Sequence, residues 1–216
     1  MLALLSVIAL ASAALHIRAE FRGPRSHVYV LKPLTTACLL GIALVGEPVD
    51  PLYRGLIVFG LAFSLAGDVF LMLPSDRFLA GLASFLVAHL CYIAAFVSTT
   101  GPQVSPTALV PWLVAGAGIV ALLAPHFGSM RAPALLYVLV ILTMGWQATE
   151  QWNAVRETWA LCALIGAVLF AVSDSALALN RFRHPFRASP LVILGTYYTA
   201  QYLIALSTLI TLSTTG

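Results

Sequence analysis

Eight long apolar segments, separated by short polar connections, make up almost the whole chain. They cover residues 1–17, 28–46, 54–73, 78–98, 107–124, 132–149, 159–179 and 190–212. Each has a length close to the 20 or so residues that a helix needs to cross a bilayer. Lipid offers no hydrogen-bond partners to irregular backbone, so segments of this kind fold as helices. The sequence predicts an all-α integral membrane protein, a bundle of about eight transmembrane helices in one domain over residues 1–216.

The composition leaves little material outside the membrane. Of the 216 residues, 61% are hydrophobic and only 9% are charged, whereas a soluble domain has about 25% charged residues. The basic residues fall mainly in short connections, so the net charge of +3 does not indicate a nucleic-acid partner. Cys38, Cys91 and Cys162 lie inside apolar segments without a CxxC spacing, which is typical of buried small side chains.

The basic residues also predict an orientation in the membrane. The first, third, fifth and seventh connections carry eight arginines, and the other connections carry Arg54 and Arg156. The eight are Arg18, Arg22, Arg25, Arg77, Arg131, Arg181, Arg183 and Arg187. By the positive-inside rule, the odd-numbered connections face the cytoplasm and both termini lie outside. We expect the protein in the inner membrane of a bacterium.

The first apolar segment allows two interpretations. It ends in Ala11-Ser12-Ala13, which resembles a signal-peptidase site. However, no basic residue precedes the apolar run, as it would in a signal peptide. A retained first helix is favoured, and cleavage is the alternative.

Two aspartates, Asp68 and Asp174, interrupt segments that are otherwise almost free of charge. A carboxylate at the centre of a membrane helix costs roughly 2.5–3.5 kcal/mol. Purely structural pairing is one explanation for both residues. The stronger interpretation is a functional polar chamber inside the bundle.

Further polar residues fall at a similar depth in other segments. At about 1.5 Å per residue, Asp68 lies roughly 7–8 Å from the cytoplasmic end of its helix, and Asp174 lies at a similar depth. Lys32, Tyr137 and Tyr197 enter the same layer, while the first and fifth segments offer nothing comparable. Each has an alternative explanation, because a lysine can snorkel to the interface and tyrosines can be core or interfacial aromatics.

His89 and Tyr92 lie deeper, one turn apart on one face of the fourth segment. A histidine in a membrane helix is often only a helix–helix contact. The chain has no HExxH, CxxC or GxSxG sequence. We therefore expect neither a metal nor another cofactor.

A weak internal symmetry accompanies these residues. The separations Asp68–Tyr92 and Asp174–Tyr198 are equal, at 24 residues. Two parallel four-helix halves would produce such a repeat, as in some transporters.

Several short motifs, taken in order along the chain, resemble those of the YhhN-like lysoplasmalogenase family of eight-span membrane proteins. They are Lys32-Pro33, Gly67-Asp68-Val-Phe-Leu71, Phe78-Leu-Ala-Gly81, Phe85-Leu-Val-Ala-His89-Leu-Cys-Tyr92 and Ser173-Asp174-Ser-Ala-Leu-Ala178. The resemblance covers nearly the whole chain. The polar positions that it carries over are Lys32, Asp68, His89, Tyr92 and Asp174.

The resemblance implies hydrolysis of the vinyl ether of lysoplasmalogens to a fatty aldehyde and glycerophosphoethanolamine or glycerophosphocholine. Protonation of the alkene gives an oxocarbenium ion, and two carboxyl groups in different protonation states suit such chemistry. We expect Asp68 and Asp174 to be catalytic, either one being the acid, with Lys32 beside the ionised one. The expected substrate-binding residues are Lys32, His89, Tyr92, Tyr137 and Tyr197.

The depth of the polar layer fits a lipid substrate, because a vinyl ether lies just beneath the glycerol. The phosphate would then meet Lys32 or the Arg181–Arg187 cluster, and the chain would pass Phe85 and His89. The main alternative is a small proton-coupled transporter that uses the same aspartates, with Thr143, Gln147 and Glu150 as a second half-channel. A non-catalytic lipid-binding scaffold is a third interpretation. The sequence leaves the head-group preference and the oligomeric state open.

Overall fold

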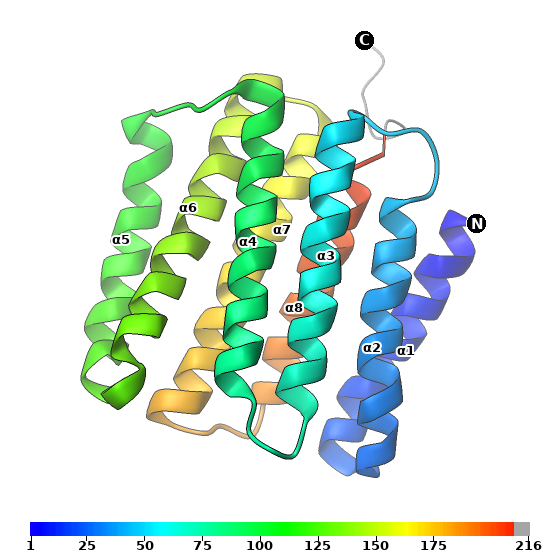
Figure 1. Ribbon diagram of the computed structural model, residues 1–216, viewed down its shortest axis with the longest axis vertical. Coiled ribbons are helices and arrows are strands. Elements are labelled where there is room, and N and C mark those ends of the chain that lie inside the picture. Colours follow the sequence, from blue (N-terminus) through cyan, green and yellow to red (C-terminus); the bar gives the residue numbers. More distant parts are fainter. Residues whose placement is uncertain (210–216) are drawn as a thin grey trace.

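The computed structural model describes residues 1–209 of the chain, which form a bundle of helices (Figure 1). The long helices are α1 (Leu2–Arg22), α2 (Arg25–Ala43), α3 (Pro51–Met72), α4 (Phe78–Thr100), α5 (Pro106–Leu123), α6 (Arg131–Val155), α7 (Thr158–Ala178) and α8 (Ser189–Leu206). Three short helical turns accompany them: η1 (Ala124–His126), η2 (Gly128–Met130) and η3 (Leu179–Arg183). Within residues 1–209 there is no strand, so the predicted all-α fold is confirmed.

Seven of the described helices, all except α8, are long and apolar enough to cross a membrane. Helix α8 is less apolar because Tyr197, Tyr198 and Gln201 lie in its middle, yet it packs along α7 inside the bundle. The predicted helical membrane bundle is thus confirmed. The last three residues of the predicted span 190–212 lie outside the described part of the chain.

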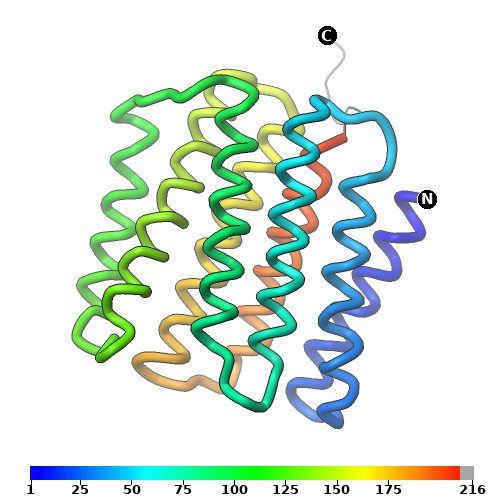
Figure 2. Tube along the Cα trace, in the orientation of Figure 1, coloured from blue at the N-terminus to red at the C-terminus, as the bar shows by residue number. Residues whose placement is uncertain are grey.

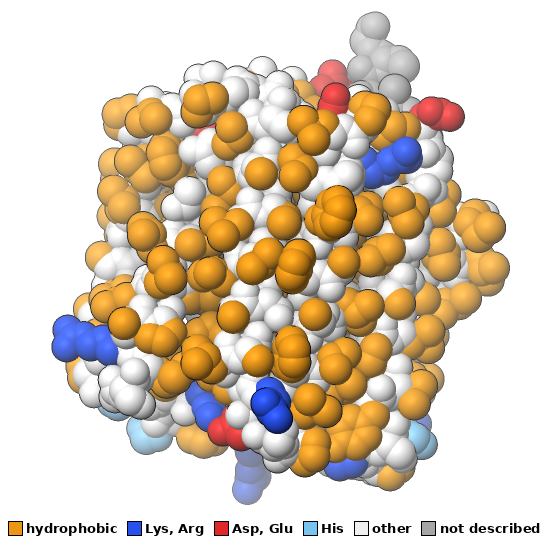
Figure 3. All heavy atoms as spheres, in the orientation of Figure 1, with side chains coloured by type: hydrophobic (Ala, Val, Ile, Leu, Met, Phe, Trp, Pro, Cys, Tyr) orange, Lys and Arg blue, Asp and Glu red, His pale blue; other side chains and the backbone are white. Residues whose placement is uncertain are grey.

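Successive helices run in alternating directions (Figures 1 and 2). The connections α1–α2, α3–α4, α5–α6 and α7–α8 lie at one end of the bundle, and the N-terminus lies at the other. Hydrophobic side chains cover the middle of the visible face, and charged side chains gather toward the two ends (Figure 3). This distribution is the one expected of a protein whose middle contacts lipid.

Local sequence explains where several helices begin and end. Proline occupies the first turn of α3, α5 and α8, where its missing N–H costs no hydrogen bond. The Asp50 carboxylate caps α3 by accepting a hydrogen bond from the Tyr53 backbone N–H at 2.7 Å. Gly101 ends α4 with a φ of +71°, a conformation that favours glycine.

The central core is built mainly from α2, α3, α4, α6, α7 and α8, and α1 adds Ala9 to it. Helix α3 approaches α4 closely at Gly67, where a Cβ atom would lie 2.7 Å from the ring of Phe85. A small residue at such a crossing lets the two helices approach closely, here with the Phe85 ring against the backbone of α3. This close approach fixes the position of Asp68, the next residue along α3.

The helix neighbours follow a regular scheme. If the chain is divided into two halves of four helices, α2 corresponds to α6 and α4 corresponds to α8. Helix α2 contacts α8, and its counterpart α6 contacts α4. Helix α5 lies at the edge of the bundle against α6 (Figure 1). Two parallel four-helix halves would produce this pair of contacts. The internal repeat itself stays a prediction.

Candidate active site

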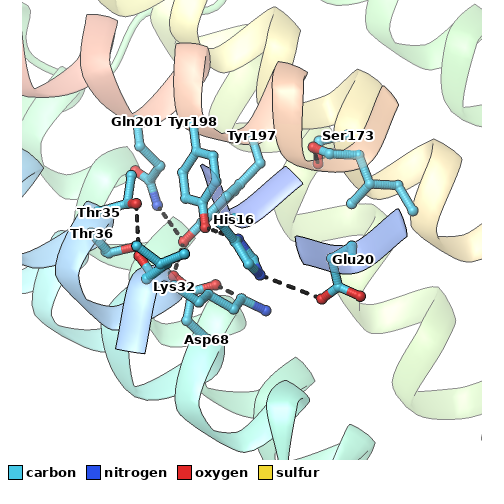
Figure 4. Close-up of polar contacts among 12 residues, drawn as sticks. His16, Glu20, Lys32, Thr35, Thr36, Asp68, Ser173, Tyr197, Tyr198 and Gln201 are labelled. Atoms are coloured by element: carbon cyan, nitrogen blue, oxygen red, sulfur yellow. Dashed lines mark hydrogen bonds and ion pairs between the residues drawn. The ribbon is translucent and has the colours of Figure 1, made fainter. Parts of the chain in front are cut away.

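Asp68 of α3 is almost fully buried and is held by side chains of two other helices, α2 and α8. Its Oδ2 accepts hydrogen bonds from Thr36 Oγ1 of α2 at 2.6 Å and from the Tyr197 hydroxyl of α8 at 2.8 Å. Lys32 Nζ of α2 lies 3.5 Å from Oδ1. Lys32 and Thr36 are four residues apart, so both face Asp68 from one side of their helix (Figure 4). All of these contacts stabilise the ionised carboxylate.

A buried hydrogen-bond network extends behind this carboxylate. Gln201 Nε2 donates to the Tyr197 hydroxyl at 3.4 Å, and the Tyr92 hydroxyl donates to Gln201 Oε1 at 2.8 Å. Ser64 Oγ lies 3.4 Å from the Tyr92 hydroxyl. Tyr92 is therefore connected to Asp68 through Gln201 and Tyr197.

Asp174 of α7 has different surroundings. The Tyr137 hydroxyl of α6 donates to its Oδ2 at 2.5 Å, and His89 Nε2 of α4 lies 3.9 Å from the same oxygen. The His89 ring is buried edge-on against the rings of Phe170 and Tyr137, with centroids 4.6 and 5.3 Å away. Among the described residues, neither lysine nor arginine forms an ion pair with Asp174. Its environment is thus much less charged than that of Asp68.

Both aspartates line one polar cavity of about 370 Å³. Lys32 and Tyr197 also line this cavity. Its lining includes five charged residues from the connection end of the bundle: Glu20, Arg25, Asp76, Arg77 and Arg181. The cavity thus joins two carboxyl groups to a charged rim.

A second, apolar cavity of about 800 Å³ lies among α4, α5, α6 and α7. Asp174 lines this cavity too, together with Tyr137. The other side chains that the two cavities share are Leu71, Phe78, Phe85 and Leu177. Asp174 is therefore a carboxyl group at the junction of a polar space and an apolar one.

Comparison with known proteins identifies the family of this chain. A sequence profile of the YhhN family matches residues 27–208. A protein of Escherichia coli O157:H7, named Uncharacterized membrane protein YhhN, is 33% identical over 197 residues, which cover 91% of this chain and 94% of that protein. The chain belongs to the YhhN family. The resemblance seen in the sequence motifs is confirmed.

Other relatives of this YhhN-family chain have names that state an activity. The human protein named Lysoplasmalogenase TMEM86B is 34% identical over 181 residues, 83% of this chain and 74% of that protein. A Mycobacterium bovis protein named Lysoplasmalogenase is 32% identical over 177 residues, 78% of this chain and 65% of that protein. No solved structure shows a significant match.

The structure places the predicted site residues of the YhhN-family chain in three positions. Asp68, Asp174, Lys32 and Tyr197 line the polar cavity, and Tyr137 lines the apolar cavity. Among the described side chains, His89 and Tyr92 line neither cavity. His89 lies beside Asp174, and Tyr92 is connected to Asp68 through Gln201 and Tyr197. Their role in substrate binding stays a prediction.

The predicted arginine cluster is divided by the structure. Arg181 lines the polar cavity, whereas Arg183 and Arg187 line neither cavity. The π-helical turn η3 carries Arg181 and Arg183.

Sequence reasoning missed Thr36 and Gln201, although each is four residues from a predicted residue, Lys32 or Tyr197, and so shares a helix face with it. The expectation that the first segment holds nothing comparable is wrong. His16 of α1 is fully buried, its Nδ1 lies 2.7 Å from the Tyr198 hydroxyl, and its Nε2 lies 3.4 Å from Glu20 Oε1 (Figure 4). Helical spacing again links the pair, since Glu20 follows His16 by one turn.

The polar residues of α6 that suggested a second half-channel have local partners. The Glu150 carboxylate accepts hydrogen bonds from the Ser105 backbone N–H at 2.6 Å and from Trp146 Nε1 at 2.9 Å. The Thr143 hydroxyl donates to the Leu139 carbonyl at 2.8 Å. Glu150 thereby anchors the start of α5 to α6.

Proposed function

We propose that this chain hydrolyses the vinyl ether of lysoplasmalogens, releasing a fatty aldehyde and a glycerophospho head group. The observation that carries the proposal is the position of Asp174 between the apolar and polar cavities. A lysoplasmalogen has its vinyl ether at the same kind of boundary, between an alkenyl chain and a glycerophosphate. The family relatives named lysoplasmalogenase support this assignment.

The two cavities suggest how the lipid binds. The alkenyl chain occupies the apolar cavity among α4, α5, α6 and α7, and the glycerophosphate occupies the polar cavity. The vinyl ether then lies beside Asp174, at the boundary of the two cavities, where Leu71, Phe85 and Leu177 line both. The apolar cavity keeps the alkenyl chain away from water. The reacting bond at its end is thereby held beside the carboxyl groups.

Asp174 is the general acid in this mechanism. It lies among apolar and aromatic side chains, an environment that favours the neutral carboxylic acid. The Tyr137 hydroxyl, bonded to Oδ2, fixes the orientation of the group. Asp174 gives its proton to the alkene carbon that is not bonded to oxygen, and a C–H bond forms as the C=C bond becomes an oxocarbenium ion.

Asp68 is the general base and the counter-charge. Lys32, Thr36 and Tyr197 all stabilise its ionised form. Its negative charge favours the oxocarbenium ion, and it takes a proton from the water that adds to the cationic carbon. The resulting hemiacetal then breaks its bond to the glycerol oxygen, which receives that proton, while the hydroxyl proton returns to Asp174. One water molecule is consumed, and both carboxyl groups regain their starting states.

The test is aldehyde release from a lysoplasmalogen by the purified, detergent-solubilised protein. We expect Asp68→Asn and Asp174→Asn each to lower the rate by at least about a hundredfold, because each removes a proton-transfer group. Glu47→Gln, an exposed substitution in the α2–α3 connection, serves as the control. In ¹⁸O-labelled water the released glycerophospho product should contain no label, because water attacks the alkenyl carbon. No aldehyde from folded wild-type protein would overturn the proposal and favour the proton-coupled transporter.

The same proposal includes the membrane orientation. The arginine-bearing connections and the charged rim of the polar cavity lie at one end of the bundle. With that end in the cytoplasm, as the positive-inside rule predicts, both termini lie outside and the site opens toward the cytoplasmic leaflet of a bacterial inner membrane.

A further inference from the structure

The rim of the polar cavity carries both signs of charge. Arg25, Arg77 and Arg181 supply guanidinium groups, and Glu20 and Asp76 supply carboxylates. A purely anionic ligand would need only the arginines. Each rim carboxylate must therefore be balanced either by a neighbouring arginine or by a positive group of the ligand.

One of the two rim carboxylates already has a close cationic partner. Asp76 Oδ2 accepts a hydrogen bond from Arg181 Nη2 at 2.8 Å, and the Arg181 guanidinium also lies over the Phe78 ring at 4.8 Å. Asp76 and Arg181 thus neutralise each other across the mouth of the cavity. Neither group needs the ligand for its charge balance.

Glu20 has no comparably close cation. Its Oε2 lies 3.9 Å from Arg25 Nη1, beyond hydrogen-bond distance, and the Arg25 side chain is 70% exposed. The buried His16 ring holds the other oxygen, Oε1, from one turn earlier on α1 (Figure 4). The side chain of Glu20 is only 26% exposed and lines the cavity. The Glu20 carboxylate therefore has a defined orientation and faces the polar cavity, in which the head group would bind.

We propose that Glu20 binds the primary ammonium of a phosphoethanolamine head group, while Arg25 and Arg77 bind its phosphate. The cavity thereby selects ethanolamine over choline and over a bare phosphate. This inference rests on the proposed function for the identity of the lipid, and it adds the residues that determine head-group specificity.

The preference for a primary ammonium follows from the chemistry of the lining. A carboxylate accepts hydrogen bonds from N–H groups, which a quaternary ammonium lacks, and proteins bind quaternary ammonium with aromatic cages. The aromatic residues that line the described cavity are Phe78, Phe85 and Tyr197. The Phe78 ring is covered by Arg181, and Phe85 packs edge-on against Tyr197 at 5.8 Å. These rings do not form a cage around Glu20.

Glu20 and Arg25 lie before residue 27, where the match to the family profile begins. The catalytic aspartates lie within that match. The ammonium-binding Glu20 at the end of α1 and the phosphate-binding Arg25 at the start of α2 thus lie outside the matched segment, whereas Arg77 lies within it.

The experiment measures binding without turnover. Native mass spectrometry of the intact detergent-solubilised protein compares 1-O-hexadecyl glycerophosphoethanolamine, the corresponding choline lipid and hexadecyl glycerophosphate, all of which lack the vinyl double bond. Wild-type protein should prefer the ethanolamine lipid over the other two by about tenfold or more, the value of one charge-assisted contact. Glu20→Gln should remove this preference and leave hexadecyl glycerophosphate binding within about twofold. Glu47→Gln should change nothing.

Two results would overturn the inference. One is equal binding of the ethanolamine and choline lipids by wild-type protein, a comparison that needs no variant. The other is an unchanged ethanolamine preference in Glu20→Gln. Because the analogues cannot be hydrolysed, these results are independent of the aldehyde assay, whose failure would overturn the proposed function alone.

Discussion

At the scale of single residues, the two aspartates inside the bundle differ in their partners. Asp68 has a lysine and two hydroxyl donors, whereas Asp174 has one hydroxyl and a buried imidazole. Burial disfavours the charged form of both carboxyl groups, more for Asp68, whose side chain is 2% exposed, than for Asp174, whose side chain is 14% exposed. In the proposed mechanism, these different partners let one carboxyl group act as the acid and the other as the base.

The hydrogen bond from Tyr137 to Asp174 has a measurable role in this mechanism. Tyr137→Phe keeps the ring but removes the donor, so Asp174 loses its fixed orientation. We expect kcat to fall about tenfold or more, the value of one hydrogen bond to an ionisable group, with little change in KM. The control is Tyr202→Phe, which removes a 3.0 Å hydrogen bond to Ser6 outside the two cavities. Equal activity of the two variants would contradict the role of Tyr137.

The pair of Lys32 and Asp68 gives a prediction for stability. Lys32→Met leaves a buried carboxylate without its cation, a change that typically costs about 3–5 kcal/mol. We expect a lower melting temperature for Lys32→Met and partial recovery when Asp68→Asn is added. Aldehyde release should stay absent in the double variant. A double variant as unstable as Lys32→Met would show that the two residues are not coupled.

At the scale of helices, the α3–α4 contact positions Asp68. The missing side chain of Gly67 lets Phe85 pack directly against the backbone of α3. The same phenylalanine lines both cavities. One helix crossing therefore sets both the carboxyl group and the wall beside it.

Gly67→Ala tests this crossing. The added Cβ would lie 2.7 Å from the Phe85 ring, so the ring or the helix must move. Overpacking of this kind costs about 1–3 kcal/mol, and we expect a lower melting temperature together with reduced aldehyde release. The matched control is Gly55→Ala on the same helix, where no atom lies within 4 Å of the added Cβ. Alanine favours helices over glycine, so the control should be neutral or stabilising.

At the scale of the whole molecule, the second half of the chain forms the apolar cavity with α4. Helix α5 contributes few buried residues and lies at the edge of the bundle (Figure 2). It covers a cavity that α4, α6 and α7 would otherwise open to lipid. In the proposed function, the peripheral helix α5 is the outer wall of the cavity that binds the alkenyl chain.

The size of that space should set the chain-length preference. Ala171 lines the apolar cavity one turn before Asp174. Ala171→Phe would fill the part of the cavity near the reacting bond. We expect kcat/KM to fall more for an octadecenyl substrate than for an octenyl one, measured by aldehyde release. An equal loss of kcat/KM for both substrates would show that the alkenyl chain does not bind in the apolar cavity.

Hydropathy alone was sufficient for the architecture, because membrane insertion depends on the local apolar length of each segment. It predicted the eight helices closely, including the connections that lie together at the arginine-bearing end. It also singled out Asp68 and Asp174, since an isolated carboxyl group within an apolar run is conspicuous without any knowledge of packing.

The partners of those aspartates were decided only by tertiary structure. Thr36 of α2 meets Asp68 of α3, Gln201 of α8 meets Tyr92 of α4, and His16 of α1 meets Tyr198 of α8, each through the rotation and crossing of helices. Hydropathy does not encode helix rotation, because lipid-facing and core-facing residues are equally apolar in a membrane protein. For the same reason, hydropathy did not indicate that Asp174 would lie between two cavities. The sequence determined which groups enter the membrane, and packing determined what each of them contacts.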